Sequence, residues 1–158
     1  MDILMQAALA YETLTQHKFR ITFSNGESII VRFRKNNFRH LSGLDKCKDL
    51  QEIATCYNPS ELHSKVCRGE ITIYDLQRSN RYFEVLDRIT FLPNIKEMLC
   101  CGLAVFGFDP SKTTFQSKLK STILLFFDDS FEFYLTLGLV ESTGCYYPET
   151  FFNNFGGG

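Results

Sequence analysis

The sequence predicts an α+β fold: an N-terminal helix and β-hairpin, a central helical segment, and a C-terminal antiparallel sheet. Apolar residues recur at helical spacing near the start, alternate over residues 19–33, and become strand-like again after Gly102. The 158 residues, 44% of them hydrophobic, suffice for one domain with a packed core. We expect residues 1–155 to form that domain and residues 156–158 to be a flexible tail.

The first helix is predicted over residues 3–15. Its apolar residues fall on one helical face: Ile3, Leu4, Ala7, Ala8, Tyr11 and Leu14.

A β-hairpin is predicted next, around the turn at residues 24–26. A two-residue turn would pair Ile21 with Ile30 and mix polar with apolar side chains. A three-residue loop pairs Ile21 with Ile29 instead and keeps one face apolar, so we prefer it. The other face then carries Lys18, Arg20, Arg32 and Arg34, with Ile30 among them. A solvated surface is the commoner explanation of such a face, and a nucleic-acid surface is the alternative.

The later elements follow from capping residues and from the change of period. Helical segments are predicted within residues 36–44, 45–57, 59–69, 72–79, 80–92 and 95–100, with Pro93 as a break. Strands are predicted at residues 103–108, 121–127 and 131–139, and the aromatic segment 146–152 is expected to pack on the sheet.

Several classes of protein receive no support from the composition. No apolar run reaches the roughly 18 residues of a membrane span, and the first residues lack the basic region of a signal peptide, so we expect a cytoplasmic protein. The six cysteines are then expected to be reduced. Cys56, His63 and Cys67 match no common zinc spacing, so we expect no metal and no cofactor.

Charge is distributed unevenly although the net charge is only −1. Six basic residues lie between His17 and His40, against one acidic residue, whereas no lysine or arginine follows Ser121. The asymmetry is informative about partners: the basic half suits phosphate, or the two halves balance each other within the molecule.

The densest part of the basic half is the predicted strand–helix junction. It holds Arg32, Arg34, Lys35, Arg39 and His40 within nine positions. Metal-independent RNA cleavage needs a base, an acid and cations, and histidine is the usual acid or base near neutral pH. His40 is therefore a candidate acid or base and Arg34 a candidate phosphate contact. The alternative is a structural histidine on a solvated surface.

Two further polar clusters are candidates. Ser79-Asn80-Arg81 is either part of a site or a helix cap followed by a solvated arginine, and Thr150 either touches a phosphate or ends a strand. Motifs for phosphate-binding loops, serine hydrolases and zinc proteases are absent, and Asp128 and Asp129 lie in a predicted turn, which disfavours a two-metal site.

Short motifs from Phe19 to Phe152 resemble one known family. They are Ile-Val-Arg-Phe-Arg ending at Arg34, Asn-Phe-Arg-His-Leu-Ser-Gly-Leu ending at Leu44, Gly-Glu-Ile-Thr ending at Thr72, a helix with Arg88, and Tyr-Pro-Glu-Thr-Phe-Phe ending at Phe152. The chain is similar to the phage-barnase-EndoU-colicin E5/D-RelE-like nuclease type 4 family.

That resemblance implies a small α+β fold of this nuclease type with a central antiparallel sheet. It also implies a metal-independent ribonuclease, carried by phages or mobile elements and directed at host or rival RNA. Carried onto this chain, it favours Arg34, His40, Ser79 and Thr150 as site residues. The acidic C-terminal half departs from the cations expected of an RNA-binding sheet.

Three hypotheses follow. In the first, an RNA endonuclease uses His40 as acid or base, with nucleic-acid contacts from Lys18, Arg20, Arg32, Lys35, Arg39 and Arg81. In the second, an inhibitor of a host defence system, such as an anti-CRISPR protein, binds a ribonucleoprotein or trims its guide RNA. In the third, the chain is a structural or regulatory oligomer without nucleic acid. The RNA, a host protein target and the oligomeric state stay open.

Overall fold

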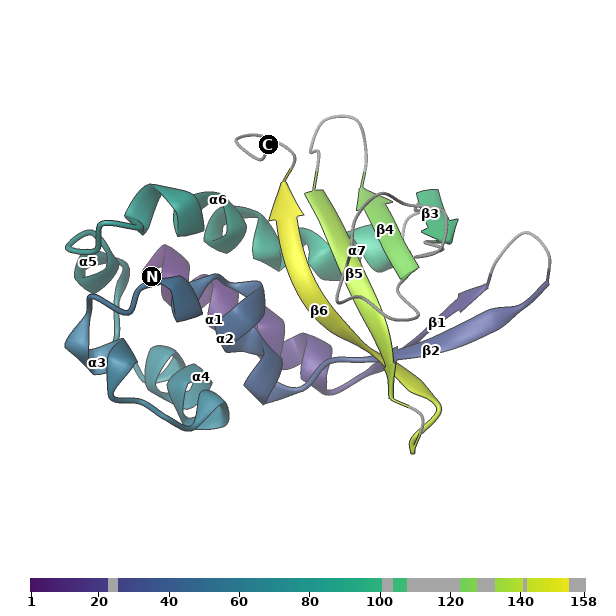
Figure 1. Cartoon of the computed structure of the whole chain (residues 1–158), viewed down its shortest axis with the longest axis horizontal. Coiled ribbons are helices and arrows are strands. Elements are labelled where there is room, and N and C mark those ends of the chain that lie inside the picture. Colours follow the sequence, from purple (N-terminus) through teal and green to yellow (C-terminus); the bar gives the residue numbers. More distant parts are fainter. Residues whose placement is uncertain (23–25, 101–103, 108–122, 128–132, 141, 154–158) are drawn as a thin grey trace.

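The structure is a computed structural model and describes residues 1–22, 26–100, 104–107, 123–127, 133–140 and 142–153. Helices gather on one side and a single sheet on the other, with β6 crossing next to the helices (Figure 1). One apolar core joins the two layers. It contains Leu4 and Tyr11 from the first helix together with Leu135, Leu137 and Phe151 from the sheet. The predicted α+β class is confirmed.

The helix α1 (Ile3–Thr15) matches its predicted bounds. Asp2 caps it, because its Oδ1 accepts hydrogen bonds from the backbone N–H groups of Leu4 and Met5. The Tyr11 hydroxyl donates to the Arg34 carbonyl at 2.6 Å, which ties this helix to the strand–helix junction.

The sheet joins the predicted hairpin to the C-terminal strands. The strands are β1 (Lys18–Thr22), β2 (Ser28–Arg32), β3 (Ala104–Gly107), β4 (Ile123–Phe127), β5 (Phe133–Val140) and β6 (Cys145–Asn153). Their order across the described part of the sheet is β1-β2-β6-β5-β4-β3, and only β2 and β6 run parallel, meeting at Val31 and Tyr146. The aromatic segment expected to pack on the sheet is thus itself a strand.

The hairpin register is the predicted one. Ile21 pairs with Ile29 and Phe19 with Val31, so the apolar side chains share the face that meets the core. Residues 23–25 of the turn lie outside the described residues.

The helical segments are η1 (Lys35–Asn37), α2 (Phe38–Leu41), η2 (Leu44–Lys46), α3 (Gln51–Ala54), α4 (Pro59–Cys67), α5 (Ile73–Leu76), α6 (Tyr82–Phe91), η3 (Leu92–Asn94) and α7 (Ile95–Cys100). One prediction needs correction. Residues 45–57 form no single helix, because Leu50 is extended at φ −94° and ψ 120° and buries its side chain. The predicted break at Pro93 is confirmed: α6 ends at Phe91, and Pro93 lies in the first turn of η3, which separates α6 from α7.

Gly43 brings α2 and α6 into close contact. Its φ of 82° lies in the left-handed region that favours glycine, and a Cβ there would lie 2.9 Å from Val85 Cγ1. The segment after α2 therefore turns back against α6. Within the described residues, no helix combines the length and apolar character that crossing a bilayer requires.

Candidate active site

The strand–helix junction lies beside the final strand. After Val31 the chain leaves β6 and continues through η1 into α2, which packs against β6. The basic segment singled out in the sequence is thereby placed next to residues 147–150, more than a hundred positions later in the chain. In Figure 1, α2 lies to the left of β6, on the same side as the other N-terminal helices.

His40 is oriented by Asp45. Its Nδ1 lies 2.9 Å from Asp45 Oδ2, and the side chain is about half exposed, at 51%. Burial alone would raise the pKa of Asp45, but the hydrogen bond and charge of His40, with the charges of Arg88 and Lys46, bring it below the usual value. An ionised Asp45 selects the tautomer with hydrogen on Nδ1, which leaves Nε2 for a ligand.

Arg88 stands behind this pair. The middle of its side chain passes beside Gly43, and its charge acts on Asp45. Burial lowers the pKa of Arg88, although an arginine stays protonated in any case. The resemblance drew attention to the helix with this residue, and the structure places its charge near the His40–Asp45 pair.

Glu149 occupies a β-bulge. Thr136 pairs with Thr150 and Leu137 with Pro148, so Glu149 is the extra residue on β6. Its carboxylate lies over Gly138, where any Cβ would collide with it. Bulges redirect side chains and are common beside active sites.

The two threonines next to the bulge bond to each other across the strands. Their hydroxyls form a hydrogen bond, and the Thr150 N–H donates to Thr136 Oγ1 at 3.1 Å. Thr150, a predicted site residue, therefore lies directly beside Glu149.

The Glu149 carboxyl is partly buried and incompletely satisfied. Burial raises its pKa, and the nearby charge of His40 lowers it by less. Its Oε2 is a buried oxygen without a hydrogen-bond partner, as are Oδ1 of Asp45 and Oδ1 of Asn37. Such atoms are uncommon in folded proteins because they lose the donors that water offered. The unpartnered oxygens of Asp45 and Glu149, whose carboxylates both interact with His40, suit N–H or O–H groups of a ligand.

Arg34 stacks on Tyr147 next to this cluster. The guanidinium carbon lies 3.9 Å from the centre of the ring. Hydrogen bonds from Thr143 and Arg34 lower the pKa of the Tyr147 hydroxyl. Tyr147 pairs with Gly138 on β5, and the adjacent residue of that strand, Leu137, faces the core. Because successive residues of a strand point to opposite faces, Gly138 and Tyr147 face away from the core. Arg34, Tyr147 and Glu149 thus share the sheet face turned away from the helical core.

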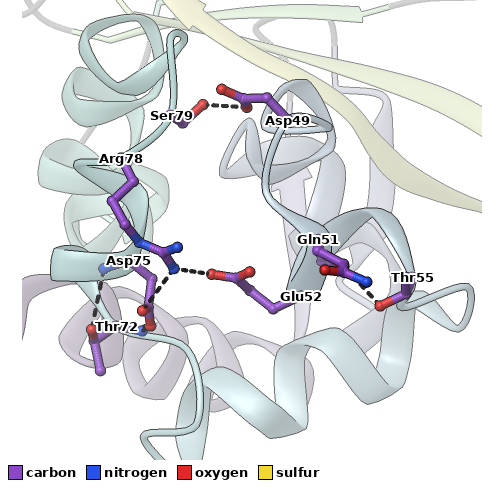
Figure 2. A network of polar contacts seen from close by, with 8 residues as sticks. All are labelled: Asp49, Gln51, Glu52, Thr55, Thr72, Asp75, Arg78 and Ser79. Carbon is purple, nitrogen blue, oxygen red and sulfur yellow. Dashed lines mark hydrogen bonds and ion pairs between the residues drawn. The ribbon is translucent and has the colours of Figure 1, made fainter.

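Ser79 lies in a different setting. Its hydroxyl donates to Asp49 Oδ1 at 2.7 Å, and the Asn80 N–H donates to Asp49 Oδ2 at 2.7 Å. Figure 2 shows this contact in a network with Glu52, Asp75 and Arg78. None of the hydrogen bonds between described residues links Ser79 to His40.

The predicted nucleic-acid contacts divide into two groups. Three are engaged within the protein: Lys35 with Glu12 at 3.9 Å, Arg39 with the Cys56 carbonyl at 3.1 Å, and Arg81 with Glu84 at 2.6 Å. The others, Lys18, Arg20 and Arg32, are exposed on the hairpin and form no ion pair with any described residue.

Sequence reasoning missed Asp45, Tyr147 and Glu149 as site residues. One local signal was present: a proline inside a strand is confined to edges and bulges, and Pro148 precedes the bulged residue. Nothing local indicates that Glu149 lies over Gly138, since their contact depends on the pairing of two strands.

The other histidines and the cysteines offer less. His63 is buried and its Nε2 donates to the Ala8 carbonyl at 2.9 Å, which is a structural role. Cys47, Cys56, Cys67 and Cys145 are free thiols. Within the described ranges, no three His, Cys, Asp or Glu side chains are grouped so as to hold a metal ion.

Comparison with known proteins supports the resemblance noted in the sequence. Residues 3–156 match the family model described as phage-Barnase-EndoU-ColicinE5/D-RelE like nuclease4. Neither the curated proteins nor the solved structures contain a match to the chain. Because the match spans nearly the whole length, this chain belongs to the phage-barnase-EndoU-colicin E5/D-RelE-like nuclease 4 family.

Proposed function

We propose that the protein is a metal-independent RNA endonuclease in which Glu149 and His40 form the acid–base pair. The observation that carries the proposal is the Glu149 carboxylate, which a β-bulge holds over Gly138 with one oxygen unpartnered. Its charge interacts with that of His40, whose ring is oriented by Asp45. A carboxylate and an imidazole of this kind supply both proton transfers that RNA cleavage requires.

In the proposed reaction, Glu149 accepts the proton of a ribose 2′-hydroxyl. The 2′-oxygen bonds to the adjacent phosphorus, and the bond from phosphorus to the 5′-oxygen breaks. His40, protonated at Nε2, gives that proton to the departing 5′-oxygen. The products are a 2′,3′-cyclic phosphate and a free 5′-hydroxyl. The raised pKa of Glu149 brings it nearer to neutrality, which improves a general base.

Charge stabilisation is assigned to Arg34. Its guanidinium is exposed, lies over the Tyr147 ring and shares a sheet face with Glu149, so it suits the equatorial oxygens of a phosphorane. Asp45 holds the His40 ring in place through its contact with Nδ1. We assign positioning roles to the remaining candidates: Thr150 fixes the bulge, and Ser79 joins two helical segments through Asp49.

The test is cleavage of mixed RNA, including tRNA and guide RNA, with and without EDTA. We expect EDTA-resistant cleavage that leaves cyclic phosphate ends, and its loss in His40→Ala. His17→Ala is the matched control, because His17 is exposed before β1 and has no place in the proposed chemistry. Cleavage that needs a divalent ion, or that survives His40→Ala, would overturn the proposal.

A binding role without cleavage is the second candidate. The exposed hairpin cations favour it, because they suit a ribonucleoprotein without any need for the acid–base pair. Such a protein, for which we propose a phage or mobile-element origin, would block a host defence complex by binding its ribonucleoprotein. Folded protein that binds RNA tightly without cleaving it would support this candidate.

A further inference from the structure

Three cations form an exposed row on the β1–β2 hairpin. Lys18 pairs directly with Arg32, and Arg20 pairs with Ile30, so all three share one face of the ribbon. We call Lys18, Arg20 and Arg32 the hairpin cations. Figure 1 shows the ribbon extending away from the helices beyond its single meeting point with β6.

These charges are not neutralised by any ion pair within the described residues. Like charges directly opposite each other destabilise an antiparallel pair, and Lys18 faces Arg32. Three exposed arginines of the helical part are paired, by contrast: Arg68 with Glu61, Arg78 with Asp75, and Arg81 with Glu84. The hairpin therefore carries a local electrostatic cost that an anionic ligand relieves.

Protection of a sheet edge explains only part of this pattern. Charged residues on an edge strand prevent pairing with other chains, and β1 is an edge strand. Arg32, however, belongs to β2, which has β1 on one side and β6 on the other. A role in edge protection does not account for its charge.

The row leads to the candidate active site. Arg34 follows Arg32 by two residues along extended backbone, with the buried Phe33 between them on the opposite face. At about 3.3 Å per residue, the row from Arg20, opposite Ile30, to Arg34 spans about 13 Å. It ends where Arg34 stacks on Tyr147, two residues from Glu149.

We propose that the hairpin cations hold the phosphates of single-stranded RNA on one side of the scissile bond. This inference rests on the proposed function for the position of that bond. A single row along a narrow ribbon suits one backbone, as in proteins that track single strands, whereas a duplex presents two backbones across a groove. The substrate class is therefore an RNA with several unpaired nucleotides beside the cleaved one.

The first test measures how cleavage depends on substrate length. The length advantage is the ratio of kcat/KM for an RNA of about twelve nucleotides to that for a dinucleotide. We expect the triple variant Lys18→Gln, Arg20→Gln, Arg32→Gln to lower this ratio by about tenfold. The control removes three lysines from the helical part of the chain: Lys48→Gln, Lys65→Gln and Lys96→Gln. Equal loss in both triple variants would overturn the proposal.

The second test measures binding without cleavage. The ligand is a 2′-O-methyl oligonucleotide, which lacks the 2′-hydroxyl needed for cleavage. Its affinity is measured at several salt concentrations, with and without the triple substitution, in both the wild type and His40→Ala. Losing three phosphate contacts lowers the slope of log affinity against log salt by about 2 for a single strand. Arg32→Gln alone should lower it by about 0.7, which keeps the test available if the triple variant does not fold.

The outcomes separate the two proposals. If the triple substitution lowers the slope in a protein that never cleaves RNA, the result supports RNA binding by the hairpin cations and overturns the proposed nuclease activity. If the slope is unchanged in a protein that does cleave RNA, only the proposed role of the hairpin cations is overturned. Equal affinity for polyglutamate of the same charge would also overturn it, because the hairpin would then favour an acidic protein.

Discussion

Two polar clusters in this molecule differ in how completely their oxygens are hydrogen-bonded. In the network of Figure 2, Asp49 accepts from Ser79 and Asn80, and Asp75 accepts from Thr72 and Arg78. Around His40, by contrast, the carboxylates of Asp45 and Glu149 each keep a buried oxygen without a partner.

The difference supports our proposal that the cluster around His40, and not the network of Figure 2, binds the substrate. A satisfied network stabilises the arrangement of helices and has little capacity left for a substrate. Unsatisfied buried oxygens cost stability, and natural proteins tolerate such costs mainly at functional sites. His40 and Ser79 both lie at predicted helix starts among polar neighbours, so only the three-dimensional contacts separate them.

Replacing Glu149 by glutamine is expected to have the largest effect. The amide keeps the shape but cannot accept the 2′-hydroxyl proton, so kcat should fall by about 10² to 10⁴. Cleavage of RNA at saturating substrate measures it. Glu61→Gln, an exposed carboxyl on α4, is the matched control. Full activity in Glu149→Gln would remove the basis for treating this cluster as catalytic.

The same variant should be more stable than the wild type near neutral pH. Folding raises the pKa of the Glu149 carboxyl, so the folded state favours its protonated form. The stability that this group contributes is therefore present below its unfolded-state pKa and is lost as pH rises through its folded-state pKa. The gain in Tm of Glu149→Gln should therefore grow between about pH 4 and pH 7. A loss of stability at neutral pH would mean that the carboxylate has a stabilising partner.

Gly138→Ala tests the position of the carboxylate. The new Cβ would collide with the end of the flexible Glu149 side chain, which must move, so the protein should lose about 0.5–1.5 kcal/mol of unfolding free energy. Adding Glu149→Ala removes the colliding atoms, so the double variant should regain most of that loss in a denaturant titration. If the change in the double variant equals the sum of the changes in Gly138→Ala and Glu149→Ala, the Glu149 side chain does not lie over Gly138.

Asp45→Asn should have a smaller effect because the pair is partly exposed. The amide no longer favours hydrogen on Nδ1 or stabilises a protonated His40, so kcat should fall by about tenfold. The pKa of Asp45 is lowered in the folded protein, so the stability it contributes is present above its unfolded pKa and is lost as pH falls. The Tm difference between variant and wild type should therefore be larger at neutral than at acid pH, in calorimetry at both.

Much of the fold follows from local patterns. Alternation over residues 18–34 predicted the hairpin register, because one slip would expose the apolar face. The segment 45–57 was mispredicted because Asp49 turns to bond Ser79 and Asn80 about thirty positions later, and Leu50 enters the core. Propensity describes short stretches and does not include such long-range contacts.

For the candidate site, too, local patterns in the sequence were informative and long-range contacts could not be foreseen. Charge density predicted Arg34 and His40 because these residues are neighbours in sequence. Glu149 was seen only as one of the acids that make the C-terminal half unlike an RNA-binding sheet. In the structure it lies near His40, so this acid is a candidate partner of the basic junction. Its placement depends on a bulge and on the pairing of β5 with β6, which a single sequence does not specify.

Ser79→Ala is expected to have the smallest effect. It tests whether the fully hydrogen-bonded network of Figure 2 has only a structural role. The variant loses the hydrogen bond that Ser79 donates to Asp49 and the one that it accepts from the Arg81 N–H, which together should cost about 1 kcal/mol of unfolding free energy. The Asn80 N–H still donates to Asp49, so the turn before α6 should keep its shape and kcat should stay near that of the wild type. Denaturant titration and RNA cleavage measure the two quantities. A folded Ser79→Ala protein with strongly reduced kcat would place Ser79 in the active site, and hydrogen-bond satisfaction would then fail to distinguish the two clusters.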